Sequence, residues 1–248
     1  MSATVRLEGA RMRPIQDVRT VRRWGTAACM VIAPLGVAVI RGLIPYFNST
    51  GGGADQVAGY AAHPAVYPFI AIAGLAVVLT VSTAMQGLGR LIQGRSPRLA
   101  LIGTPLATVG WMMVAVLVTL DAVAYELSSS GIGSAAAGAL LDRVGNNLFP
   151  SQAFGIFLIG HLLGTLLLGV GLLRSGRVSA WASIAVIAGD VLHPIAYVVA
   201  HLQVLDVIAY LVLAAGLAGA ARAVLATPNK DWDLAPSNQD NAAPFGSK

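Results

Sequence analysis

Residues 152–173 read QAFGIFLIGHLLGTLLLGVGLL, a run of 22 residues in which His161 is the one ionisable side chain. A helix needs about 20 apolar residues to cross the hydrocarbon core of a bilayer. Because the bilayer offers no water to backbone polar groups, such a segment must satisfy them internally as a helix. The stretch therefore predicts a transmembrane helix, and Gly160 with Gly164 predicts close packing against a neighbouring helix.

Five further apolar runs of similar length occur in the 248 residues, and charged residues make up only 11% of the chain. An average soluble domain has about 25%. We place the six expected spans at roughly residues 26–46, 67–89, 99–126, 152–173, 179–200 and 204–225. The predicted fold is an all-α, polytopic bundle of six transmembrane helices over residues 26–226, with no separate soluble domain.

The basic residues predict the orientation of the bundle. Of the 16 Arg and Lys residues, all except Arg41 and Arg143 lie in the N-terminal segment, in two alternate loops, or from residue 222 onward. The positive-inside rule places these regions, and both termini, in the cytoplasm. Residues 1–25 are then a basic cytoplasmic segment, residues 227–248 a disordered cytoplasmic tail, and the protein a multi-pass protein of the plasma membrane.

Composition also narrows the partners. The net charge of +5 does not indicate nucleic acid, because the basic residues are dispersed between apolar runs instead of forming a phosphate-binding face. Cys29 is the single cysteine, which excludes an intrachain disulfide and a cysteine-based metal site; no metal site is expected. The expected partners are the lipid bilayer and a hydrophobic small molecule, and the sequence leaves the oligomeric state open.

Two outer loops differ in their expected order. The loop from Asn48 to Val66 contains Gly51, Gly52 and Gly53 and is expected to be flexible. In the longer loop over residues 128–150, the stretch 135–148 is expected to form a short interfacial helix.

Ionisable residues inside the spans are the main functional signal, because a charge at the centre of a span costs roughly 2.5–3.5 kcal/mol on insertion scales. In the predicted topology they all lie between the bilayer midplane and the outer surface. The residues are Arg41, Asp121, Glu126, His161, Asp190 and His193, with His201 and Asp206 at the turn between the last two spans.

Helical periodicity groups these residues with aromatic side chains. Such stripes should face the bundle interior, because lipid does not solvate them. On span five, Pro194 is expected to free a backbone carbonyl near Asp190 and to kink the helix. The three stripes are Asp190, His193, Tyr197 and His201; Asp121, Tyr125 and Trp111; and Phe154, Phe157, His161 and Thr165.

An acid and an imidazole in an aromatic, apolar cavity are what protonation-initiated cyclisation of an isoprenoid or prenylated small molecule requires. No cofactor is needed. Asp190 is the expected acid with His193 orienting it, and Asp121 and His161 are the next candidates for acid or base. The expected substrate-binding residues are Trp111, Tyr125, Phe157, Tyr197 and Arg41.

Other interpretations stay open. His201 and Asp206 would simply belong to a solvent-exposed loop, and Arg41 would reach the lipid head groups or pair with Asp121. Asp190 with His193 would be a structural hydrogen-bonded pair. A b-type haem would use His161 with His193 or His201 as its two ligands. A non-catalytic sensor or a transporter would use the same outer pocket, although the cytoplasmic half offers no polar path.

The stretches Phe157-Leu-Ile-Gly-His161-Leu-Leu-Gly164, Gly171-Leu-Leu-Arg174-Ser and Ser179-Ala-Trp181-Ala resemble a pattern of small actinobacterial multi-pass membrane proteins of unknown function. The resemblance covers mainly spans four and five. In size and character the chain is also similar to bacterial integral membrane terpene cyclases, such as those making drimane-type indole sesquiterpenoids. This resemblance implies cyclase activity but assigns no residue, and the DxDD signature of soluble class II cyclases is absent.

Overall fold

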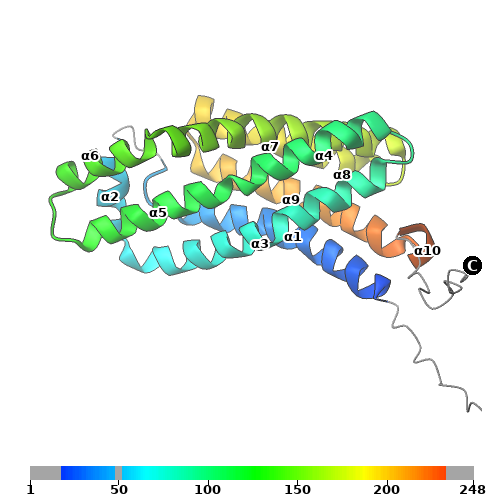
Figure 1. Ribbon diagram of the computed structural model, residues 1–248, viewed down its shortest axis with the longest axis horizontal. Helices are drawn as coiled ribbons and strands as arrows, with labels where there is room; N and C mark the ends of the chain where they lie inside the picture. Colours follow the sequence, from blue (N-terminus) through cyan, green and yellow to red (C-terminus); the bar gives the residue numbers. More distant parts are fainter. Residues whose placement is uncertain (1–17, 48–51, 233–248) are drawn as a thin grey trace, which may run out of the picture.

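The computed structural model describes residues 18–47 and 52–232, and these residues form helices with no strand among them (Figure 1). Within these described residues, six stretches are long and apolar enough to cross a membrane, which confirms the predicted all-α bundle of six spans. These stretches are Arg19–Leu43, Pro64–Ile92, Pro97–Ser129, Leu148–Ser175, Ala180–Ala200 and Gln203–Ala226.

Three of the spans are not single α-helices, and the second span begins with a short 3₁₀ turn. The elements are α1 Arg19–Leu43, α2 Gly53–Ala62, η1 Pro64–Val66, α3 Tyr67–Ile92, α4 Pro97–Met112, α5 Val114–Ser129, α6 Ser134–Gly145, α7 Leu148–Ser175, α8 Ala180–Pro194, η2 Ile195–Ala200, α9 Gln203–Ala226 and α10 Asn229–Trp232. The third span divides at Met113, between α4 and α5. In the fifth span, α8 continues after Pro194 as η2, a stretch of π-helix.

Pro194 explains this change of helix type. Proline has no backbone N–H, so the α-helical hydrogen bond to residue 190 is not formed. A π-helix shifts the hydrogen bonds to residues five apart and commonly occurs as a short insertion within an α-helix. The segment ends at His201, whose backbone is left-handed with φ of 50°. A π-helical stretch thus follows Pro194, and the expected kink near Asp190 stays a prediction.

The loop that we expected to be flexible is largely helical. Gly51 lies outside the described residues, but Gly53 begins α2, and Gly52 supplies a positive φ of 64° just before it. The short helix expected near residues 135–148 is present as α6. Gly138 lets the two helices touch, since a Cβ atom there would lie 2.3 Å from the Ala54 Cα. The glycines that resembled a flexible loop instead permit this packing.

The helices α2 and α6 cover one end of the bundle, which we call the capped end (Figure 1). The Asp142 carboxylate of α6 accepts a hydrogen bond of 2.8 Å from the Gly53 backbone N–H, at the first turn of α2. The free N–H groups of a helix N-terminus favour such a negative partner. This bond ties the two cap helices together.

At the opposite end of the bundle, part of the predicted disordered tail is helical. The predicted disordered tail began at residue 227, yet residues 229–232 form α10 and Trp232 is buried. The Arg90 guanidinium lies 5.6 Å from the Trp232 ring centroid, and Arg23 donates hydrogen bonds to the carbonyls of Leu225 and Thr227. A buried tryptophan anchors this segment. Residues 1–17 of the predicted basic segment and 233–248 of the predicted tail lie outside the described residues.

Glycines join α4 to α7 along a close seam, as the Gly160 and Gly164 pair predicts. A Cβ atom at Gly160 would lie 2.6 Å from the Gly110 Cα, and one at Gly164 would lie 2.5 Å from the Ala107 Cα. Neither backbone can move away without separating the helices. The seam therefore fixes where Trp111 and the rest of the cavity wall stand relative to α7.

Gly160→Leu should lower the melting temperature of the purified protein in detergent, because the added side chain must push α4 away from α7. Overpacking of this kind costs about 1–3 kcal/mol or more. Gly155→Leu on the same helix is the matched control, since a Cβ atom there meets no heavy atom within 4 Å. Equal melting temperatures for the two variants, measured by circular dichroism, would contradict the seam.

Candidate functional site

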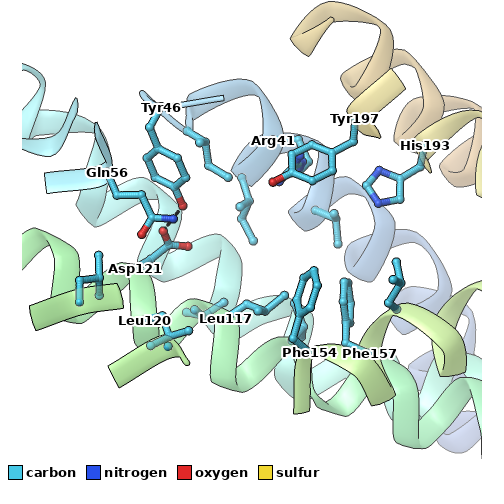
Figure 2. Close-up of a pocket in the computed structure, with 18 of the residues that line it drawn as sticks. Arg41, Tyr46, Gln56, Leu117, Leu120, Asp121, Phe154, Phe157, His193 and Tyr197 are labelled. Atoms are coloured by element: carbon cyan, nitrogen blue, oxygen red, sulfur yellow. Dashed lines mark hydrogen bonds between the residues drawn. The ribbon is translucent and has the colours of Figure 1, made fainter. Parts of the chain in front are cut away.

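A cavity of about 330 Å³ lies inside the bundle next to the capped end (Figure 2). Its wall is mostly apolar and is built by α1, α4, α5, α7, α8, η2 and α9, with contributions from both cap helices. Six aromatic side chains line it: Tyr46, Trp111, Phe154, Phe157, Tyr197 and Tyr210. The polar lining residues are Arg41, Gln56, Asp121, Asp142, Asn146 and His193.

A buried carboxylate organises one side of this cavity. Asp206 of α9 has no exposed surface, and it accepts hydrogen bonds from Arg41 Nε and His193 Nδ1, each at 2.5 Å. The three residues come from α9, α1 and α8. A buried charge is tolerated only when it is paired and hydrogen-bonded. Asp206 finds its partners on two other helices, so the network holds α1, α8 and α9 together at one point.

Two aromatic rings pack against the Arg41 guanidinium. Its central carbon lies 4.6 Å from the Tyr197 ring centroid and 4.9 Å from that of Phe47. The π turn of η2 carries Tyr197 to this position. Arg41 Nη2 is buried and has no hydrogen-bond partner among the described residues. One side of the guanidinium is thus bound to Asp206, while a second donor group is unused.

Asp121 forms the other polar centre of the cavity. Its Oδ1 atom accepts hydrogen bonds from the Tyr46 hydroxyl and, at 3.0 Å, from the Tyr60 hydroxyl. Burial, together with the adjacent Asp121 carboxyl, raises the pKa of the Tyr60 phenol above its ordinary value, so that this group stays a donor. Both tyrosines hold one oxygen of Asp121, which leaves Oδ2 without a partner among the described residues.

The predicted pairing of Asp190 with His193 is wrong. His193 Nδ1 binds Asp206, and Asp190 is buried, is absent from the cavity wall and makes no hydrogen bond or ion pair within the described part of the chain. Three-residue spacing puts both side chains on one face of α8, but the imidazole meets a carboxylate across the helix interface. Asp206 is therefore a buried residue and does not belong to a solvent-exposed loop. Arg41 pairs with Asp206 and not with Asp121.

His161 lies beside the cavity but does not line it. Its Nδ1 is 2.6 Å from the Phe157 carbonyl, and its ring stacks on Phe157 with centroids 4.2 Å apart. The Trp111 ring lies 5.0 Å away and donates its N–H to Thr165. His161 Nε2 is buried without a hydrogen-bond partner in the described residues. His161 is thus a packed histidine behind the wall.

The two histidines do not form a haem site as they stand. The His161 and His193 ring centroids are 5.8 Å apart, which is near the separation of two axial imidazoles. However, Phe157 stacks on His161, and the Tyr210 ring lies 4.8 Å from His193. A porphyrin between them would collide with these rings. His201 is exposed at the end of η2, so the residues present do not fit a haem.

Of the nine residues predicted to be catalytic or substrate-binding, six lie on the cavity wall and three do not. Asp121, His193, Trp111, Phe157, Tyr197 and Arg41 line the cavity, while Asp190, His161 and Tyr125 lie outside its lining. Tyr125 stacks on Tyr67 with centroids 4.1 Å apart, behind Tyr60.

Sequence reasoning missed Tyr46, Tyr60, Tyr210 and the role of Asp206. Tyr46 and Tyr60 flank the glycine-rich stretch that was read as a flexible loop, so nothing marked them. Tyr210 follows Asp206 by four residues, and that spacing places both on one face of α9. The spacing would have identified a polar stripe on the sixth span.

Searches with protein-family models, among curated proteins and among solved structures find no match to this chain.

Asp206→Ala should destabilise the protein by about 3–5 kcal/mol, because it leaves Arg41 buried without its counter-charge. The measurement is thermal unfolding in detergent. Glu126→Ala provides the control, since this acidic side chain is exposed on α5. A variant at position 206 that melts like the Glu126 variant would show that the buried network does not stabilise the bundle.

Proposed function

We propose that this chain is an integral membrane enzyme that catalyses protonation-initiated cyclisation of an isoprenoid or prenylated small molecule. The observation that carries the proposal is the position of a carboxyl group and an imidazole on opposite sides of one aromatic cavity. Asp121 and His193 occupy these two sides in Figure 2, with Phe154 and Phe157 between them.

In this proposal Asp121 is the acid. With Oδ1 held by Tyr46 and Tyr60, the proton resides on Oδ2 and is delivered to a terminal alkene or epoxide of the substrate. An apolar site keeps a carboxyl group protonated, because its ionised form is poorly solvated there, so the proton is available for transfer to the substrate. The tyrosine hydroxyls then stabilise the carboxylate that the transfer leaves behind.

His193 is the proposed base. Asp206 accepts the hydrogen bond from Nδ1–H, and this contact directs the lone pair to Nε2. A carboxylate that binds one imidazole nitrogen orients the ring and stabilises its protonated form. His193 is therefore suited to removing the last proton from the cyclised cation. One proton enters and one leaves, so the product is an isomer of the substrate.

The aromatic lining supports the same chemistry. A cation over an aromatic face is stabilised by about 2 kcal/mol or more in a dry site, and Trp111, Phe154 and Phe157 offer such faces. The nearby Arg41 charge is offset by Asp206, which lies within 2.5 Å of its Nε atom.

We further propose that the basic end of the bundle faces the cytoplasm and that the capped end faces outward across the plasma membrane. The positive-inside rule is the support for this orientation. The cavity then lies in the outer half of the bilayer, within reach of lipid-soluble substrates.

The orientation predicts opposite labelling of two single-cysteine variants in intact cells. In a Cys29→Ser background, Arg143→Cys on α6 should react with a membrane-impermeant maleimide, and Arg177→Cys, between α7 and α8, should react only after lysis. Reversed labelling would show that the capped end faces inward.

The cyclase proposal is tested with purified protein in lipid nanodiscs and a panel of farnesylated small molecules. Wild type should form an isomer of equal mass and new retention time, and in D₂O this product should carry one deuterium. Asp121→Asn should lower the rate about 10²- to 10⁴-fold, as expected for loss of a general acid. Glu126→Gln on the same helix should retain activity.

Two outcomes would reject parts of this proposal. Full activity of Asp121→Asn with loss of activity in Asp190→Asn would return the acid role to Asp190. Binding of the panel without conversion by wild type would instead favour the alternative function, a non-catalytic sensor that uses the same cavity.

A further inference from the structure

The cavity opens sideways between α5 and α7. Phe154 and Leu158 of α7 line the cavity, yet they are 48% and 39% exposed. On the facing helix, Leu117 and Leu120 also line the cavity and are only half-buried. The cap helices close the neighbouring end of the bundle, so the apolar flank of the cavity is the side that meets lipid in a membrane.

The opposite wall carries an unused hydrogen-bond donor. Arg41 Nη2 is buried and has no partner in residues 18–47 and 52–232, although Arg41 lines the cavity. A guanidinium only donates hydrogen bonds, and its planar fork suits the oxygens of a carboxylate or phosphate. Asp206 does not bind Nη2: its two oxygens accept hydrogen bonds from Arg41 Nε and His193 Nδ1.

We propose that the cavity binds an amphipathic lipid acid whose carboxylate or phosphate oxygen accepts a hydrogen bond from Arg41 Nη2, with its apolar chain leaving the bundle between α5 and α7. This inference adds a substrate class to the proposed function, and the bound lipid acid is a substrate only if that function holds. The binding itself does not depend on the reaction.

The depth of Arg41 agrees with this assignment. Arg41 lies in the last turn of α1, which ends at Leu43, close to the turn that leads toward the capped end. A lipid head group at that level stays near the membrane surface while its chain reaches the hydrocarbon core. The cavity, at about 330 Å³, is at the small end of ligand pockets, so part of a long chain must remain in the bilayer.

The local charges also favour an acid. Arg41 carries a positive charge, and a hydrogen bond from it to a charged oxygen is roughly twice as strong as one to a neutral oxygen. The Tyr197 and Phe47 rings lie 4.6 and 4.9 Å from the guanidinium carbon, and Nη2 has no hydrogen-bond partner among the described residues. A neutral alcohol offers an acceptor oxygen but gains no charge pairing.

The test measures binding of three radiolabelled probes to the full chain in nanodiscs: farnesoic acid, farnesyl phosphate and farnesol. Wild type should bind at least one of the acids about tenfold or more tightly than the alcohol. A preference for farnesoic acid identifies a carboxylate ligand, and a preference for farnesyl phosphate identifies a phosphate ligand.

Arg41→Lys should abolish this preference, because the single ammonium nitrogen stays beside Asp206 and no second nitrogen occupies the position of Nη2. Affinity for the preferred acid should fall about tenfold to a hundredfold, with farnesol affinity changed less than about threefold. Arg143→Gln controls for general charge effects, since Arg143 is exposed on α6. Thermal unfolding of each variant shows whether it is folded.

Phe154→Gln tests the opening separately, and it should weaken binding of all three probes alike. Its control is Ile159→Gln, a residue that is 57% exposed on the same helix and does not line the cavity. Equal affinity of acids and alcohol for wild type, or acid selectivity that survives in folded Arg41→Lys, would overturn the inference. Neither result bears on the turnover of Asp121→Asn, so the two proposals fail independently.

Discussion

The Asp206 carboxylate, buried between three helices, sets the position of two charged or polar groups on the cavity wall. It holds Arg41 of α1 and His193 of α8 at 2.5 Å each, and it sits one turn from the start of α9. Gln203 of the same turn donates to the carbonyls of Arg41 and Ile44, at 2.8 and 3.1 Å, and so secures the end of α1. The cavity wall depends on this first turn of α9, because a shift there would move an arginine, an imidazole and the end of α1 together.

Close backbone packing supplies the rigidity that the apolar wall needs. Between helices in a bilayer the hydrophobic effect is weak, so association relies on close contact and on hydrogen bonds. The glycines of α4, α6 and α7 supply the contact, and the carboxylates of Asp142 and Asp206 supply the hydrogen bonds. The cavity is thus the space left between a tight seam on one side and a hydrogen-bonded cap at the end.

Sequence patterns were sufficient for the spans but only partly for the site. The length and apolar character of the runs predicted all six spans, because the bilayer restricts spanning segments to helices. They did not predict α2, because Gly52 and Gly53 read locally as a loop and the helix depends on contact with α6. The wall residues Asp121 and His193 followed from helical periodicity. Their partners did not, since the angle of a residue on its own helix says nothing about which neighbouring helix it meets.

Because of the π turn after Pro194, the position of Tyr197 on the cavity wall depends on the number of residues in the fifth span. A π-helix holds one residue more in its hydrogen-bonded ring than an α-helix does. Loss of one residue from 195–200 would allow an ordinary α-helical register, and each residue of register corresponds to about 100° of rotation. Tyr197 would then turn away from Arg41. Natural variation in this chain should therefore tolerate substitutions between Ile195 and Ala200 more readily than insertions or deletions.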